Sequence, residues 1–198
     1  MTAPCLALIA CSLLAREPLR DKTLVAWVAP ANLTQRGGSV LTIEKSGGTF
    51  DAIVFGEIAE SKWMAGSDGF RRTQKDQSAF PAETADNQTL VQIAVVYKDK
   101  QITLYRNGSK YADYATDNSE RFGGDSLVLM GLRHLGANPE NRFFTGAIDD
   151  ARIYGVALDE PQIAALKPNQ PSDPPPLAWW DFEDGTAADR MKSFPTTT

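Results

Sequence analysis

The sequence is poor in cysteine and histidine, with two cysteines and one histidine in 198 residues. Cys5 and Cys11 are too few and too close to the N-terminus for a disulfide framework, and no CxxC or His/Cys spacing indicates structural zinc. Any Ser/His/Asp or Cys/His arrangement would have to use His134, and no Gly-x-Ser-x-Gly motif occurs. These absences argue against a disulfide scaffold, a zinc domain and a nucleophilic hydrolase.

Long apolar runs and clustered basic charge are also missing. No segment reaches the roughly 18 apolar residues that a membrane helix needs. The formal net charge is −5 and Arg71-Arg72 is the only adjacent basic pair, so the sequence offers no basic face for nucleic acid. Leu8 to Cys11 is similar to a bacterial lipoprotein cleavage box, with Cys11 as the lipid-bearing residue, although no positive region precedes it. The alternative is that Cys5 to Leu14 form a buried edge of the fold.

What is present is a series of short stretches typical of β-strands. The strongest signal is Gln88 to Tyr114, where two apolar strands meet at a tight loop and the second runs into Asn107-Gly108, a turn whose central positions favour positive φ. β-Branched, apolar or alternating residues predict further strands at Thr23–Val28, Ser39–Glu44, Phe50–Glu57, Ser126–Leu132 and Phe143–Tyr154. The pattern predicts an all-β fold, a two-sheet antiparallel sandwich.

The C-terminal part changes character. Asp159 is expected to cap a short helix over Asp159–Leu166, with Gln162 completing a capping box and Pro161 tolerated in the first turn. Residues 168–176 have the proline-rich composition of a linker, which predicts a sandwich domain over residues 1–167. Residues 177–198 are too few to fold alone, so they are either the truncated start of a following domain or a strand that pairs back onto the sandwich.

Three segments carry a resemblance to a known family. VQIAVVYKDKQITLYRNGSKYADY resembles the central hairpin of laminin-G-like, concanavalin A-type jelly rolls, whose second strand ends in Tyr-x-Asn-Gly. FFTGAIDDARIYGVALDEPQIAAL resembles the closing strand and helix of that family, and TLVAWVAPANL resembles its early strand carrying a tryptophan. QRGGSVLTIE and FDAIVFGE are further similar to accessory domains that precede glycoside hydrolase family 32, fructan-cleaving modules in bacterial proteins.

Carbohydrate binding by such a domain would use an aromatic platform for a sugar ring and planar polar groups for its hydroxyls. Two loop segments that could meet at one edge of the sandwich hold the candidates. The predicted carbohydrate-binding residues are Glu57, Trp63, Asp68, Phe70, Arg71 and Arg72 in the first segment, and Arg133, His134, Asn138 and Asn141 in the second. The alternatives are that Trp63 packs in the core and that Arg71-Arg72 is a solvated surface pair.

Asp149 is the candidate metal ligand. By strand alternation it shares its side with Ala147, Ala151 and Ile153, and an unpaired carboxylate on an apolar side is costly. The resemblance implies a structural Ca2+, for which loop carbonyls and an Asp or Asn from the first segment would be the other ligands. The alternative is that Asp149 accepts backbone N–H groups or pairs with an arginine.

The sequence therefore predicts a non-catalytic carbohydrate-binding accessory domain of a larger, secreted or cell-surface carbohydrate-active enzyme, with fructan as the first candidate ligand. The Glu-x-Asp-x-x-Glu strand of jelly-roll glucanases is absent, and Asp181-Phe182-Glu183-Asp184 has a different spacing. The alternative is a structural sandwich that packs against a neighbouring catalytic domain. Residues 177–198 also raise the possibility of a strand-exchanged homodimer.

Overall fold

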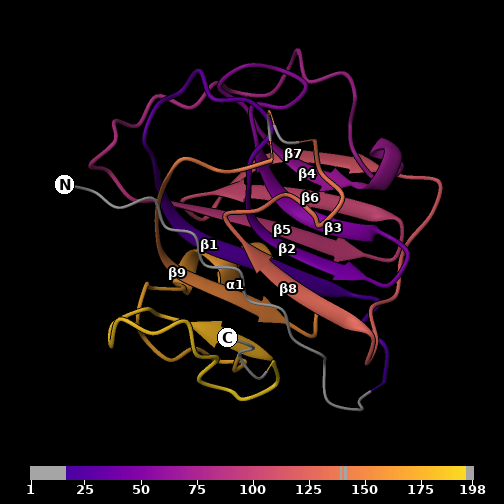
Figure 1. The fold of residues 1–198 in the computed structure, drawn as a ribbon, viewed down its shortest axis with the longest axis vertical. Helices are drawn as coiled ribbons and strands as arrows, with labels where there is room; N and C mark the ends of the chain where they lie inside the picture. The colour runs from indigo at the N-terminus through magenta and orange to yellow at the C-terminus, as the bar shows by residue number, and fades with distance from the viewer. Residues whose placement is uncertain (1–16, 139, 141, 195–198) are drawn as a thin grey trace.

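The computed structural model describes residues 17–138, 140 and 142–194, and it shows two antiparallel sheets packed face to face (Figure 1). The larger sheet has the strand order β10 (Ala178–Trp180), β9 (Gly146–Tyr154), β1 (Lys22–Pro30), β5 (Val91–Lys98), β6 (Gln101–Arg106), β7 (Ser109–Ala115). The smaller sheet has the order β4 (Trp63–Ser67), β3 (Thr49–Phe55), β2 (Ser39–Lys45), β8 (Ser126–Met130). The predicted all-β sandwich is confirmed.

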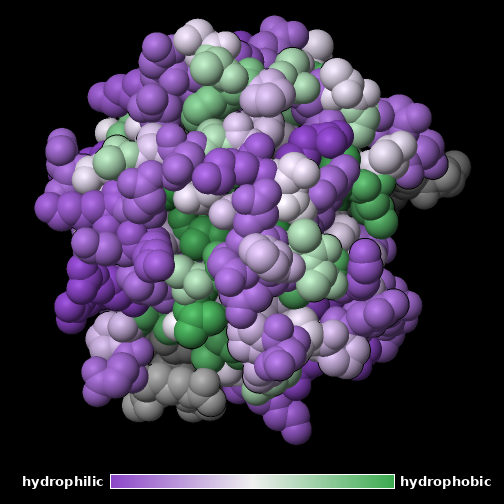
Figure 2. Space-filling model, turned by 180° about the vertical axis from the view of Figure 1, so that it is seen from behind, coloured by the Kyte–Doolittle hydropathy of each residue, from purple (hydrophilic) through white to green (hydrophobic). Residues whose placement is uncertain are grey.

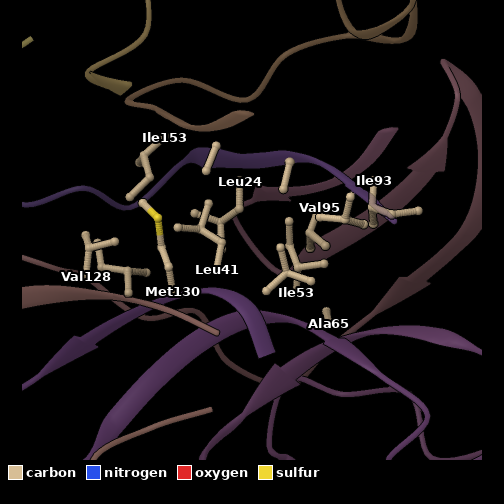
Figure 3. Close-up of a cluster of buried hydrophobic side chains, with 14 of the residues drawn as sticks. Leu24, Leu41, Ile53, Ala65, Ile93, Val95, Val128, Met130 and Ile153 are labelled. Atoms are coloured by element: carbon tan, nitrogen blue, oxygen red, sulfur yellow. The ribbon is translucent and has the colours of Figure 1, made fainter. Parts of the chain in front are cut away.

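The core lies between the sheets, where β2 packs over β1, β3 over β5 and β4 over β6. Inward-facing residues such as Leu24, Leu41 and Ile53 are wholly buried there and interdigitate with residues of the opposite sheet (Figure 3). Figure 2 shows the back of the molecule, where hydrophilic residues cover most of the surface and hydrophobic residues gather in a broken band down the middle. Among the described residues, no helix combines the length and hydrophobicity needed to cross a bilayer.

Two predictions from local sequence are confirmed in detail. Asn107 and Gly108 both have positive φ, 49° and 79°, and they turn the chain from β6 into β7. The short helix α1 (Glu160–Ala165) begins at a capping box in which the Asp159 carboxylate accepts from the Gln162 N–H, and the Gln162 side chain accepts from the Asp159 N–H, both at 2.9 Å. The helix covers a second apolar cluster on the outer face of the larger sheet.

The C-terminal residues are part of the same sandwich. β10 pairs with β9 of its own chain, and Trp180 and Phe194 are wholly buried in the core between the sheets. The segment predicted as a linker also lies against the larger sheet, because the Asn169 N–H donates to Asp150 and Arg152 donates to the Lys167 carbonyl, at 2.7 and 2.8 Å.

A buried ion pair anchors this C-terminal segment on the outer face of the larger sheet. Asp150 and Arg152 are both wholly buried and form two hydrogen bonds, of 2.7 and 2.8 Å. The Arg152 guanidinium lies between the Trp27 and Trp179 rings, 5.0 and 4.8 Å from their centres, and the Trp179 indole N–H donates to Asp150. The ion pair thus gains further hydrogen bonds and ring contacts from the C-terminal segment, and removal of that segment would leave it partly unpaired.

Candidate functional site

A polar cleft of about 460 Å³ opens at one end of the sandwich, between the 3-10 helix η1 (Asp68–Phe70) and the end of β7, which lie side by side in Figure 1. One wall is formed by the segment that follows η1, and the other by the end of β7 and the loop after it. The side chains on these walls that offer an aromatic ring, a charge or a hydrogen-bonding group are Phe70, Arg71, Thr73, Gln74, Lys75, Tyr114, Thr116, Asp117 and Asn118.

The wall at the end of β7 has both an aromatic ring and an amide side chain. The Tyr114 hydroxyl donates to the Arg72 carbonyl at 3.2 Å, and burial raises the pKa of Tyr114, so the phenol stays protonated. Asn118 is fixed through its backbone, because Thr116 donates to the Asn118 carbonyl at 2.7 Å. The Asn118 Oδ1 atom is closed to solvent and accepts no hydrogen bond from the described residues, so in this conformation a ligand in the cleft does not reach it. The Asn118 residue itself lines the cleft.

The opposite wall, formed by the segment that follows η1, is anchored by a buried ionic network. Arg72, of which 1% is exposed, donates to Asp51 and Asp68, each at 2.7 Å, and to the Phe50 carbonyl at 2.9 Å. Lys22 pairs with the second oxygen of Asp51 at 2.8 Å. Arg72 therefore does not reach ligand, and its prediction as a carbohydrate-binding residue is wrong. Sequence reasoning missed the network because its members come from three distant segments.

Trp63 is likewise unavailable to a ligand. It is wholly buried, packs against Phe55 with ring centres 4.5 Å apart, and donates its indole N–H to Glu83 at 2.8 Å. The predicted aromatic platform is therefore wrong at Trp63, and the alternative that it packs in the core is right. A buried indole N–H needs an acceptor, and the fold provides one from a loop 20 residues away in sequence.

Glu83 is that acceptor, and its carboxylate is strongly stabilised. Burial alone would raise its pKa, but hydrogen bonds from Arg106, from the Ala85 and Thr84 N–H groups and from Trp63 lower the pKa to about 2. Arg106 binds both carboxylate oxygens, at 2.9 and 2.6 Å. The carboxylate thus joins the loop before β5 to both sheets.

This geometry predicts a pH dependence of stability. Because the folded-state pKa of Glu83 lies below its ordinary value of 4.5, the unfolded chain binds the proton more tightly, and stability is lost as pH falls from about 4.5 to about 2. Glu83→Gln is expected to lower the free energy of unfolding by about 3 kcal/mol at pH 7, with a smaller difference at pH 3. Urea unfolding at both pH values measures it, with the exposed Glu60→Gln as control. An equal loss at both pH values would contradict the expectation.

The two predicted loop segments do meet, on the outer face of the smaller sheet. Arg133 forms an ion pair with Glu57, and its guanidinium lies 5.9 Å from the centre of the Phe70 ring. His134 stacks on Phe50 with ring centres 4.6 Å apart. Burial raises the pKa of Glu57 although Arg133 opposes this shift, and burial together with Arg133 lowers the pKa of His134. Arg133 and Glu57 thus pair with each other, although Arg133 Nε and Glu57 Oε2 form no hydrogen bond with the described residues. Phe70 links this cluster to the cleft.

The other predicted residues differ in their access to ligand. The Arg71 side chain is 67% exposed and lines the cleft, whereas Asp68 is committed to Arg72. Asn138 is exposed, and Asn141 and Cys11 lie outside the described residues. Gln74, Lys75, Tyr114 and Asn118 were missed. The place of the half-buried Tyr114 in the cleft lining could not be foreseen, since β7 was recognised from its hairpin alone.

Asp149 does not sit as strand alternation predicts. Trp27 pairs with Asp150 and Val28 with Ile148, so Asp149 is the extra residue of a β-bulge. Ile148, in place of Asp149, packs with Ala151 and Ile153 against the core, which makes the predicted apolar side wrong for Asp149.

The surroundings of Asp149 also bear on the expected calcium ion. Its carboxylate accepts from the Asn169 side-chain N–H at 3.3 Å, and burial and then Asp150 raise its pKa. No group of three or more acidic, histidine or cysteine side chains within the described part of the chain could hold a metal ion. Because Ca2+ also takes backbone and amide carbonyl oxygens among its six to eight ligands, the structural calcium ion stays a prediction.

The sandwich with a ligand-sized cleft at one end defines a lectin-like class of β-domain. Residues 12–164 match the family model of the concanavalin A-like lectin/glucanases superfamily, and the chain belongs to this family. A search among curated proteins finds no match for the sequence.

Solved structures share the fold at low sequence identity. A Bacteroides ovatus protein provisionally named a carbohydrate binding protein has a TM-score of 0.63 and 14% identity over 95% of this chain, which spans 55% of that protein. Domain 4 of the Geobacillus stearothermophilus extracellular arabinanase AbnA, solved with arabinotriose, has a TM-score of 0.53 and 17% identity, covering 75% of this chain and 66% of that one. The extracellular region of zebrafish Gpr126 has a TM-score of 0.64 and 11% identity, covering all of this chain and 25% of that one.

Proposed function

We propose that this domain binds glycans without cleaving them, through the cleft between η1 and β7. The observation that carries the proposal is the open cleft itself, which presents aromatic rings beside planar polar side chains. Sugars offer hydroxyl groups for the polar side chains and apolar ring faces for the aromatic residues. The arabinotriose bound by the AbnA domain and the provisional name of the Bacteroides ovatus protein support the same ligand class.

The cleft favours binding over hydrolysis. Glycoside hydrolases of the usual kind place two carboxyl groups across the scissile bond. The cleft lining, all within the described residues, includes one carboxylate, Asp117. Asp68 is held nearby by the buried Arg72 and is not free for proton transfer.

Affinity electrophoresis with soluble glycans tests the proposal. Levan and inulin test the fructan expectation, and arabinan is included because of the arabinotriose bound by the AbnA domain. Gln74→Ala combined with Asn118→Ala is expected to weaken retardation at least about tenfold, equivalent to about 1.4 kcal/mol, because both hydrogen-bonding groups line the cleft. Asn87→Ala, an exposed asparagine away from the cleft, is the matched control.

The predicted residues Arg133, His134 and Asn138 lie outside the cleft lining and allow the two candidate binding sites to be compared in one protein. Asn138→Ala should leave retardation unchanged if the cleft is the binding site. Loss of binding in Asn138→Ala together with full binding in the Gln74/Asn118 double variant would move the site to the Arg133 cluster. No retardation of the unaltered protein by any glycan tested, neutral or acidic, would overturn the proposed function.

We further propose that the domain is an extracellular accessory part of a longer carbohydrate-active protein. The similar structures support this, since this chain matches only part of each, and the AbnA domain belongs to an extracellular enzyme. Rigid contact with a neighbouring domain ranks second. Exposed apolar side chains such as Leu135 and Phe143 favour it, but the hydrophobic band in Figure 2 is interrupted by hydrophilic residues.

A further inference from the structure

The two walls of the cleft differ in charge. Arg71 and Lys75 bring two positive charges to the wall that follows η1, whereas the facing wall carries Asp117 and Asn118. The protein as a whole has a net charge of −5, so this local excess of positive charge on one wall runs against the overall balance.

These two cations are also free to bind. Lys75 is exposed and forms no ion pair with any described residue. Arg71 has only a loose contact with Asp68, 3.8 Å from nitrogen to oxygen, and the other oxygen of Asp68 is held by Arg72 at 2.7 Å. Arg72 itself shows the contrast, since it is buried and binds the carboxylates of Asp51 and Asp68. The Arg71 guanidinium therefore keeps its planar set of donors for a ligand carboxylate.

The ligand that fits must be anionic on one side and rich in hydroxyl groups on the other. A uronic acid ring has this arrangement, because its carboxylate at C5 lies across the ring from the hydroxyls at C2 and C3. The carboxylate would meet Arg71 and Lys75, and the hydroxyls would donate to Asp117 on the facing wall. Neutral fructans would leave the two cations without a partner.

We propose that the cleft selects uronate-containing glycans, with Arg71 and Lys75 as the residues that determine this specificity. The proposal rests on the proposed glycan-binding function of the same cleft and replaces fructan with an acidic ligand class. It concerns binding orientation only, and no bond is made or broken.

The test compares polygalacturonate with its fully methyl-esterified form, which has the same backbone without the charge. Isothermal titration in EDTA, which prevents calcium-induced gelation, is expected to show binding of the acid at least about tenfold tighter than of the ester, a difference of about 1.4 kcal/mol. Affinity for the acid should fall as salt concentration rises, because exposed charges are screened.

Arg71→Gln combined with Lys75→Gln is expected to remove this preference, because affinity for the acid falls at least about tenfold, to that for the ester. The matched control is Lys167→Gln with Lys192→Gln, two exposed lysines in the C-terminal part, which changes the net charge by the same amount. It should keep the preference. Equal losses in the two double variants would show general electrostatic attraction and overturn the inference.

Two other outcomes separate this inference from the proposed function. Equal binding of acid and ester that still depends on Gln74 and Asn118 would overturn the uronate assignment and leave glycan binding standing. Binding of dextran sulfate without binding of polygalacturonate would also overturn it, in favour of sulfated ligands. Dextran is the uncharged partner in that comparison.

Discussion

A chain that ends at Lys167 is expected to lose cooperative unfolding altogether. The missing segment includes Trp180 and Phe194, which are wholly buried in the core. Truncating a buried large aromatic side chain to alanine costs about 3–5 kcal/mol, and removal of both approaches the total stability of about 5–15 kcal/mol that a domain has. Asp150 would in addition lose the hydrogen bonds donated by the Asn169 N–H and the Trp179 indole N–H. Near-ultraviolet circular dichroism and chemical denaturation measure the loss.

Point variants keep this prediction testable if the short chain aggregates. Phe194→Ala is expected to lower the free energy of unfolding by about 3–5 kcal/mol, as large-to-small changes in a core do. Met191→Ala, three residues away and 41% exposed, should change it by less than about 0.5 kcal/mol. A truncated chain that unfolds cooperatively at nearly the original temperature would instead show that residues 1–167 fold on their own.

Asp51→Ala is expected to lower the free energy of unfolding by about 3–5 kcal/mol, because it leaves two buried cations without their shared partner. Asp51 is wholly buried and binds Arg72 and Lys22 at 2.7 and 2.8 Å. Lys22 keeps contacts with the Tyr97 and Phe122 rings, 4.2 and 4.7 Å from their centres, which do not replace a carboxylate.

The same variant should weaken glycan binding, because Arg72 holds the cleft wall that carries Arg71. Urea denaturation measures the stability change, and titration at a temperature where the variant is still folded measures the binding change. Asp113→Asn, on the exposed edge strand β7, is the control for stability. A loss below about 1 kcal/mol in Asp51→Ala would show that the surrounding residues or water can satisfy both cations.

The strands, the Asn107-Gly108 turn and the α1 capping box could be predicted because each depends on residues close together in the sequence. Alternation reports which face of a strand is buried, and the turn and the cap are set by a few backbone groups. The same rule failed at Asp149, since a bulge depends on the pairing of β9 with β1 and shifts the alternation by one residue.

The candidate site was predictable only in part. Phe70 and Arg71 were identified from composition and do line the cleft, and the two loop segments do meet through Arg133 and Glu57. The sequence around Trp63 is equally compatible with an exposed aromatic platform. Only the structure shows that the Trp63 ring is buried and that its indole N–H donates to Glu83. The wall containing Tyr114 and Asn118 was missed because only the tertiary structure brings it opposite the segment that follows η1.

By itself the sequence determined the all-β class, the family and the places where the chain turns, because these follow from short-range patterns that recur along the chain. Tertiary structure alone decided which polar residues are buried, that residues 168–194 belong to the sandwich, and which side chains share the cleft. The physical reason is that burial and charge pairing arise between segments far apart in sequence. Asp51 and Arg72 become neighbours only when β3 pairs with β4, and Asn118 and Gln74 only when the sheets stack.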